Sequence, residues 1–138
     1  MTQAEHKDTL REWRESAKYW AWYSATIRQM FAPLTQALIA DARIAQGHSV
    51  LDVAGGPGEP SLTIAETVGP TGSVMCADAV AEMVEAARTV ARDRHLSNIE
   101  FRQCTAESLP FLDSSFDIVV SRLGALEREF QNQLDRQP

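Results

Sequence analysis

The chain has 138 residues, of which 44% are hydrophobic and 23% charged, and its formal net charge is −6 at pH 7. This length suits one globular domain around one hydrophobic core. The acidic balance argues against a protein that binds nucleic acid or an anionic membrane surface, because both need a basic face. No apolar run reaches the ~20 residues that span a bilayer, and no secretory signal opens the chain, so a cytoplasmic protein is expected.

The N-terminal region is predicted to be helical. Apolar residues recur at three- and four-residue spacing over 9–30, which indicates an amphipathic helix with an aromatic stripe. Pro33 is expected to open a second helix that ends near Ala45, ahead of Gly47. The stripe either packs against the rest of the domain or covers a bound ligand, where its rings would attract a cation. Residues 1–47 are therefore interpreted as an N-terminal helical cap, whose stripe consists of Leu10, Trp13, Ala17, Trp20, Ser24, Ile27 and Phe31.

From Ser49 onward, predicted strands alternate with predicted helices. Alternation of this kind is typical of a parallel sheet with right-handed crossovers, so the predicted fold class is α/β with a Rossmann-like sheet. The core is expected over 48–123, and 124–138 is expected to form either an amphipathic helix or a tail of the same domain. The predicted strands are 49–53, 73–77, 99–103 and 116–121, and the predicted helices in this part include 59–68 and 80–94.

A glycine-rich turn follows the first predicted strand, in the sequence VLDVAGGPG of residues 50–58. Gly55, Gly56 and Gly58 allow the backbone to turn sharply and to approach a ligand without interference from a Cβ atom. Open parallel sheets bind ligands at the carboxyl ends of their strands. The turn therefore predicts a site for a small cofactor.

The residues around the turn favour a cationic nucleoside over a phosphate. Ser61 stands where the dinucleotide fingerprint has its third glycine, and the absence of any lysine after Lys18 excludes a P-loop. Asp52 at the strand end would repel a pyrophosphate but attract an ammonium or sulfonium group. Asp78, 20 residues beyond Gly58, can accept hydrogen bonds from both hydroxyls of a ribose, or can cap the helix that follows it.

Four segments, in the same order along the chain, resemble the class I S-adenosylmethionine-dependent methyltransferases. Residues 51–58 resemble the first motif of that family, and 74–78, 101–111 and 116–122 resemble its second, third and fourth strands with the loops that follow. Within the family, the chain looks most similar to the ubiquinone and menaquinone C-methyltransferases. The resemblance implies S-adenosylmethionine as cofactor and these binding residues: Asp52, Ala54, Gly55, Gly56, Gly58, Asp78, Ala79, Met83, Thr105, Ala106, Glu107 and Ser121.

Several of these positions have a structural alternative. Met83 either lines the adenine pocket or belongs to the core of its helix. Thr105 stands where the family often has an aspartate, so its contact with the adenine amino group would be weaker, whereas Ala106 would contribute its backbone N–H. Glu107 is interpreted as solvated, and Ser121 as either a site residue or a turn residue.

The resemblance implies a methyltransferase that acts on a small molecule. No catalytic residue is indicated, and the two cysteines and three histidines lack the spacing of a metal site. The family core normally continues to a fifth strand and a terminal hairpin, so the chain resembles a truncated core. The alternative function is an S-adenosylmethionine-binding module without turnover, and a Rossmann oxidoreductase is a more distant one. The fourth strand is expected to leave an open edge through which a homodimer could form.

Overall fold

A computed structural model describes residues 3–122 of the chain. Within this range the strands form one parallel sheet in the order β3-β2-β1-β4, and helices connect the first three strands, which confirms the predicted α/β fold. The predicted helix or tail over 124–138 lies outside the described residues. The elements are α1 (Gln3–Trp22), α2 (Ser24–Asp41), β1 (Ser49–Val53), α3 (Ser61–Val68), β2 (Ser73–Asp78), α4 (Ala81–Asp93), β3 (Ile99–Gln103) and β4 (Ile118–Val120).

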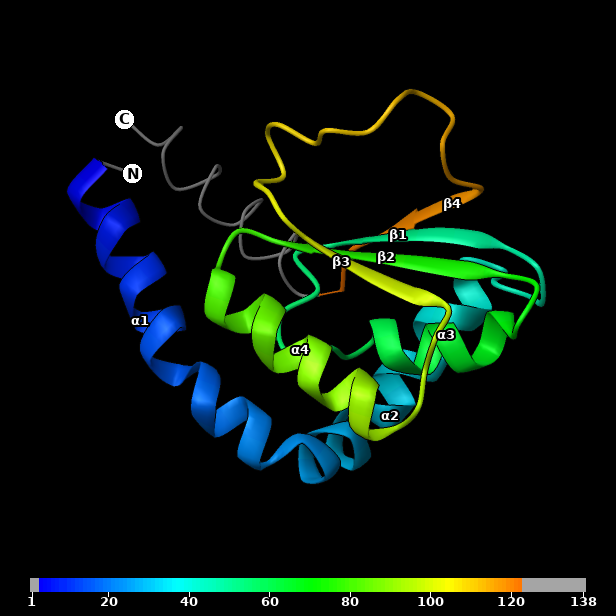
Figure 1. Cartoon of the computed structure of the whole chain (residues 1–138), viewed down its shortest axis with the longest axis horizontal. Coiled ribbons are helices and arrows are strands. Elements are labelled where there is room, and N and C mark those ends of the chain that lie inside the picture. Colours follow the sequence, from blue (N-terminus) through cyan, green and yellow to red (C-terminus); the bar gives the residue numbers. More distant parts are fainter. Residues whose placement is uncertain (1–2, 123–138) are drawn as a thin grey trace.

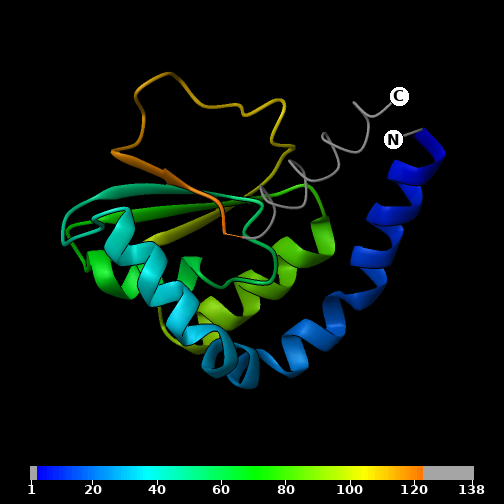
Figure 2. The ribbon, with the colours of Figure 1, turned by 180° about the vertical axis from the view of Figure 1, so that it is seen from behind.

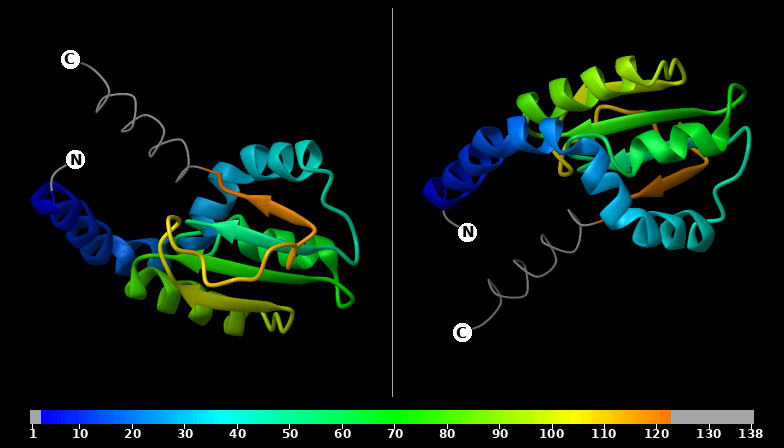
Figure 3. Two further views of the ribbon diagram at one scale, coloured as in Figure 1. Left: turned by 90° about the horizontal axis from the view of Figure 1, so that it is seen from above. Right: turned by 90° about the horizontal axis from the view of Figure 1, so that it is seen from below.

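The described helices all lie on one face of the sheet (Figures 1 and 2). The long connection over 104–117 passes across the opposite face, as the view from above in Figure 3 shows. Val119 of β4 is 60% exposed and Leu112 of the connection is 86% exposed. Large apolar side chains on this second face are therefore open to solvent.

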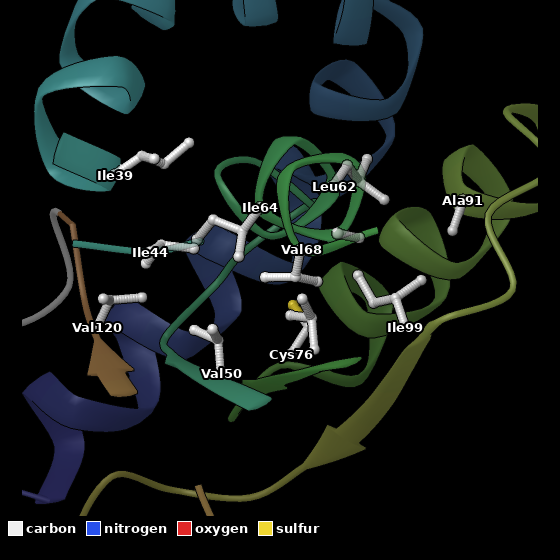
Figure 4. Packing of buried hydrophobic residues seen from close by; sticks show 12 residues of the cluster. Ile39, Ile44, Val50, Leu62, Ile64, Val68, Cys76, Ala91, Ile99 and Val120 are labelled. Atoms are coloured by element: carbon white, nitrogen blue, oxygen red, sulfur yellow. The ribbon is translucent and has the colours of Figure 1, made fainter. Parts of the chain in front are cut away.

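The main hydrophobic core fills the space between the sheet and α3 (Figure 4). Leu62, Ile64 and Val68 of α3 are fully buried against side chains such as Val50 of β1 and Cys76 of β2. Burial of each large aliphatic side chain contributes roughly 1.5 to 3 kcal/mol. Since α3 begins directly after the glycine-rich turn, this packing also fixes the position of that turn.

The carboxyl ends of the strands meet at one edge of the sheet. Asp52 of β1 lies in register with Cys76 of β2 and with Val120 of β4. Asp78, the last residue of β2, lies in register with Gln103, the last residue of β3. The segments that follow the strands therefore border a single region, which we call the carboxyl edge.

The N-terminal helices differ from their predicted boundaries. The first helix ends at Trp22, not near residue 30, and Pro33 lies inside α2 instead of opening a helix. The backbone leaves helical geometry at Tyr23, where φ is −104° and ψ is 20°. Pro33 is exposed and removes a single backbone hydrogen bond, whereas Thr35 and Ile39 of the same helix are buried against the domain. Tertiary packing thus carries α2 through the proline.

The other predicted elements agree with the structure to within about two residues at each end. The largest difference is β4, which is shorter than the predicted 116–121. Its pairing with β1 is extended by two hydrogen bonds at Asp117, whose N–H donates to the Ser49 carbonyl at 2.8 Å and whose Oδ2 accepts from the Ser49 N–H at 2.8 Å. A side chain thus replaces one rung of the ladder.

Candidate cofactor site

The backbone of the glycine-rich turn adopts conformations that require its glycines. Gly56 has φ +61° and Gly58 has φ +124°, in the left-handed region that favours glycine. A Cβ at Gly55 would lie 2.6 Å from the Cys76 Sγ, and one at Gly58 would lie 2.8 Å from the Leu62 Cδ1. A Cβ at Gly56, in contrast, would meet no atom within 4 Å. The turn is therefore closed by packing at Gly55 and Gly58 but open at Gly56.

Asp78 joins the turn to the end of β2. Its Oδ2 accepts a hydrogen bond from the Gly56 N–H at 2.9 Å, and its Oδ1 accepts one from the Val80 N–H at 2.9 Å. The second bond closes a turn ahead of α4, whose N-cap is Val80 without a side-chain cap, so Asp78 is not the predicted helix cap. Each carboxylate oxygen can accept two hydrogen bonds, so Asp78 keeps acceptor capacity for a ribose diol. Burial raises the pKa of Asp78, against the opposing effect of the N–H groups of Val80, Gly56 and Ala79.

Asp52 is the most deeply buried carboxyl group among the described residues, with 0% exposure. Its Oδ2 accepts a hydrogen bond from the Ser61 Oγ at 2.5 Å, and its Oδ1 has no hydrogen-bond partner. A buried acceptor without a donor costs stability, and its presence next to the glycine-rich turn fits a ligand that brings a donor. An ammonium group is such a donor.

The pKa of Asp52 is raised to about 7, mainly because burial removes water from its charged form. The hydrogen bond from Ser61 and the guanidinium of Arg122 oppose this rise, whereas Asp78 and Glu59 add to it. The cost of leaving this carboxylate without a cation is therefore high. A cation beside the unpartnered Oδ1 would favour the charged form.

A group of ion pairs fixes the residue that follows the turn. Glu59 is 7% exposed in its side chain, and its Oε1 lies 2.8 Å from the Arg94 Nη1 and 3.8 Å from the Arg28 Nε. Its Oε2 accepts a hydrogen bond from the Thr63 Oγ1 at 2.7 Å. Through Glu59, the end of the turn is tied to α2, α3 and the end of α4.

Most of the predicted site residues border the carboxyl edge. Ala54 is exposed with φ +59° directly after β1, Thr105, Ala106 and Glu107 are exposed in the connection after β3, and Ser121 follows β4. The N–H of Cys104 donates to the Asp78 carbonyl at 2.9 Å, which holds the start of that connection against β2. The sheet therefore brings these separate segments of the chain to one place.

Met83 lies apart from this exposed group. It is 2% exposed and packs with Ala17 and Val80, against which Leu10 and Trp13 of α1 also lie. These neighbours support the interpretation that Met83 belongs to the core of its helix over the interpretation that it lines an adenine pocket. They also show that the described part of the aromatic stripe on α1 packs on α4, as the first of its two interpretations predicts.

Three residues with marked interactions at this edge are absent from the predicted site. Ser61, Glu59 and Arg122 interact with the turn or with Asp52, as the hydrogen bond of Ser61 and the electrostatic effects on Asp52 show. Ser61 is marked in the sequence only as the residue that replaces the third glycine. Arg122 is part of the fourth predicted motif, but nothing in the sequence indicates that its guanidinium lies near Asp52.

The described residues contain no group of three or more His, Cys, Asp and Glu side chains that could hold a metal ion. Within the same range, no helix has both the length and the apolar character needed to cross a bilayer.

Comparison with known proteins identifies the family of the chain. The family described as a methyltransferase domain matches residues 50–136, which is more than half of the chain. The chain belongs to this family. The match begins in β1 and so includes the glycine-rich turn, Asp78 and the loop after β3.

Individual relatives agree with this assignment. The methyltransferase domain is 41% identical over 87 residues to the ubiquinone/menaquinone biosynthesis C-methyltransferase UbiE of Stenotrophomonas maltophilia, covering 62% of the chain and 34% of that protein. The chain spans about a third of the length of this protein and of two further UbiE proteins that it matches.

Solved structures lead to the same family. The YcgJ protein of Bacillus subtilis is 38% identical with a TM-score of 0.57, over 66% of this chain and 38% of that one. An S-adenosylmethionine-dependent methyltransferase from Aquifex aeolicus is 25% identical with a TM-score of 0.59, over 63% of this chain and 46% of that one. The predicted methyltransferase family is thereby confirmed.

Proposed function

We propose that this methyltransferase domain binds S-adenosylmethionine along its carboxyl edge and transfers the methyl group to a small molecule. The observation that carries the proposal is the placement of the open glycine turn between two carboxyl groups, Asp52 and Asp78. The open side of Gly56 admits a ligand close to the backbone, Asp78 retains acceptors for a ribose, and Asp52 lacks a donor. A sulfonium nucleoside satisfies these three conditions, whereas the two carboxylates would repel a pyrophosphate.

The protein contributes alignment more than chemistry to such a reaction. When bound, S-adenosylmethionine supplies a methyl group whose bond to the sulfonium breaks as the acceptor forms its new bond, leaving a neutral thioether, and a carbon acceptor then loses one proton. Gly55 and Gly58 keep the turn close to the sheet, and Asp78 orders the turn through Gly56. We assign no residue as the base that takes the proton.

The remaining binding residues enter as parts of the same proposal. We propose that Thr105, Ala106 and Glu107, which are exposed in the connection after β3, border the adenine, and that Ser121, which follows β4, borders the methyl end. We further propose that residues 48–123 form the binding core and that 1–47 form its helical cap, since α1 packs on α4 beside the end of β2.

The acceptor is proposed from the relatives. Those matched in sequence include ubiquinone/menaquinone biosynthesis C-methyltransferases, so an electron-rich ring carbon of a quinone precursor is the acceptor class we favour. The cytoplasmic location and the absence of a nucleic-acid partner stay predictions.

Titration calorimetry with S-adenosylmethionine, S-adenosylhomocysteine and NAD⁺ tests the cofactor. We expect saturable binding of the first two ligands and none of NAD⁺, because the dinucleotide brings a pyrophosphate to a site with two acids. Binding of NAD⁺ without binding of S-adenosylmethionine or S-adenosylhomocysteine would instead identify a Rossmann oxidoreductase.

The alternative function is a binding module that does not turn over alone. The exposed Val119 and Leu112, on the face of the sheet opposite the helices, favour this alternative because a partner chain would cover such apolar side chains. A homodimer through the edge strand β4 is the partner arrangement we propose for this case. Methyl-transfer assays with phenolic quinone precursors, together with the mass of the protein in solution, separate an active monomer from a module or a dimer.

A further inference from the structure

Arg122 is a half-buried cation that α2 holds in place. Its guanidinium lies over the ring of Phe31, with 5.2 Å between the guanidinium carbon and the ring centroid, and its Nη1 donates to the Thr35 Oγ1 at 2.5 Å. Thr35 is only 3% exposed, so this contact is made inside the protein. Two side chains of one helix thus fix the plane of the guanidinium.

The hydrogen-bonding capacity of Arg122 is largely unused. Its Nε is buried without a hydrogen-bond partner, and among residues 3–122 no carboxylate oxygen lies within 4 Å of the guanidinium. A guanidinium has five N–H donors in one plane, arranged to match the two oxygens of a carboxylate. A fixed guanidinium with an orphaned donor therefore suits an anionic ligand group.

Asp52 is an unsatisfied group of opposite charge at the same edge of the sheet. Val120 pairs in register with Asp52, and Arg122 follows two residues later, so both groups belong to the carboxyl edge. The two charges act on each other: the guanidinium lowers the pKa of Asp52, and the carboxylate raises the pKa of Arg122 against the effect of burial. They are close enough to interact but do not form an ion pair. Each therefore keeps one buried atom without a partner.

A ligand that satisfies both atoms needs a cationic donor for Asp52 and an anionic acceptor for Arg122 in one molecule. An α-amino acid has that arrangement. A phosphate would satisfy Arg122 but be repelled by Asp52, and a simple amine would satisfy Asp52 but leave the Arg122 Nε unpaired. The pair of orphaned atoms thus selects for a zwitterion.

We infer that Arg122 binds the carboxylate at the amino-acid end of S-adenosylmethionine, with Phe31 and Thr35 of α2 holding its guanidinium for that contact. The inference rests on the proposed function and adds the residue that binds the amino-acid end of the cofactor. The inference also gives α2 a role at the site, since its Phe31 and Thr35 fix the guanidinium of Arg122.

The test compares ligands with and without the carboxylate. The probes are S-adenosylhomocysteine and decarboxylated S-adenosylmethionine, titrated calorimetrically into wild type, Arg122→Gln and Arg88→Gln. Arg88 is the matched control, since its guanidinium also lies over a phenylalanine ring, that of Phe101, at 5.8 Å, but on the outer side of α4 and β3. We expect Arg122→Gln to weaken S-adenosylhomocysteine at least tenfold and the decarboxylated ligand less than twofold, and Arg88→Gln to change neither.

Other outcomes are distinguishable. Equal weakening of both ligands by Arg122→Gln would overturn the inference and leave Arg122 as a support of the site or a contact for the acceptor. If wild type binds neither ligand, the proposed function fails and the inference fails with it. Should Arg122→Gln not fold by circular dichroism, Arg122→Lys gives the same comparison, because lysine keeps the charge but loses the planar fork. Unchanged discrimination between the two ligands in that variant would count against the inference.

Discussion

Replacing Gly55 with alanine is expected to lower the free energy of unfolding by about 2 to 3 kcal/mol, as overpacking of a core does. The added Cβ would lie 2.6 Å from the Cys76 Sγ and 3.1 Å from the Asp52 Oδ2. Both neighbours are fully buried, so neither can move aside without disturbing the sheet. Urea unfolding followed by circular dichroism measures the loss.

Removal of the sulfur supplies the control for this prediction. Cys76→Ala alone leaves a small cavity, but in that background Gly55→Ala should cost clearly less than in wild type, because the closest contact is gone. Equal costs in the two backgrounds would show that the clash with Cys76 does not explain the need for glycine.

The second large effect concerns Asp52 and pH. Its pKa is raised to about 7 in the folded protein, so the fold favours the protonated carboxyl. The contribution of this group to stability is therefore complete below about pH 4, the range of the unfolded carboxyl, and is lost as the pH rises through about 7. Asp52→Asn cannot ionise and should lack this loss.

Between pH 5 and pH 8, wild type should lose on the order of 2 kcal/mol of stability relative to Asp52→Asn, since each pKa unit corresponds to about 1.4 kcal/mol. Urea unfolding of both proteins at the two pH values gives the difference, in which the titration of the exposed carboxylates cancels. Parallel pH profiles would mean that Asp52 ionises normally in the folded protein and that its Oδ1 already has a donor.

The sequence predicts the sheet well because β1, β2 and β4 consist mainly of apolar residues, and in β3 the apolar Ile99 and Phe101 alternate with polar residues. The carboxyl edge follows from that pattern, since parallel strands end together. The N-terminal helices are less predictable: the end of α1 at Trp22 and the continuation of α2 through Pro33 depend on packing against the domain. Local propensity at a proline cannot include such contacts.

The candidate site likewise has one part that the sequence predicts and another that depends on packing. Asp52, Asp78 and the glycines of the turn are visible in the sequence because chemistry and spacing mark them. The bonds of Asp52 to Ser61 and of Arg122 to Thr35 join residues nine and 87 positions apart, and the burial of Asp52 depends on both the sheet and α3. Packing also explains why Met83, which the sequence leaves equally suited to two roles, lies against α1.

The central claim is that a ligand approaches the backbone at Gly56, and a pair of alanine substitutions tests it most directly. Gly56 and Gly69 both have positive φ, +61° and +69°, and at both positions a Cβ would meet no atom within 4 Å, but Gly69 combines this φ with ψ −173°, a conformation that is nearly restricted to glycine. Alanine at Gly56 should cost about 1 kcal/mol of stability and alanine at Gly69 at least as much, so Gly69→Ala controls for a general loss of stability. Only Gly56 lies at the carboxyl edge. Titration with S-adenosylhomocysteine should show binding at least tenfold weaker for Gly56→Ala and unchanged for Gly69→Ala, whereas equal affinities in the two variants would contradict the placement of the cofactor at this turn.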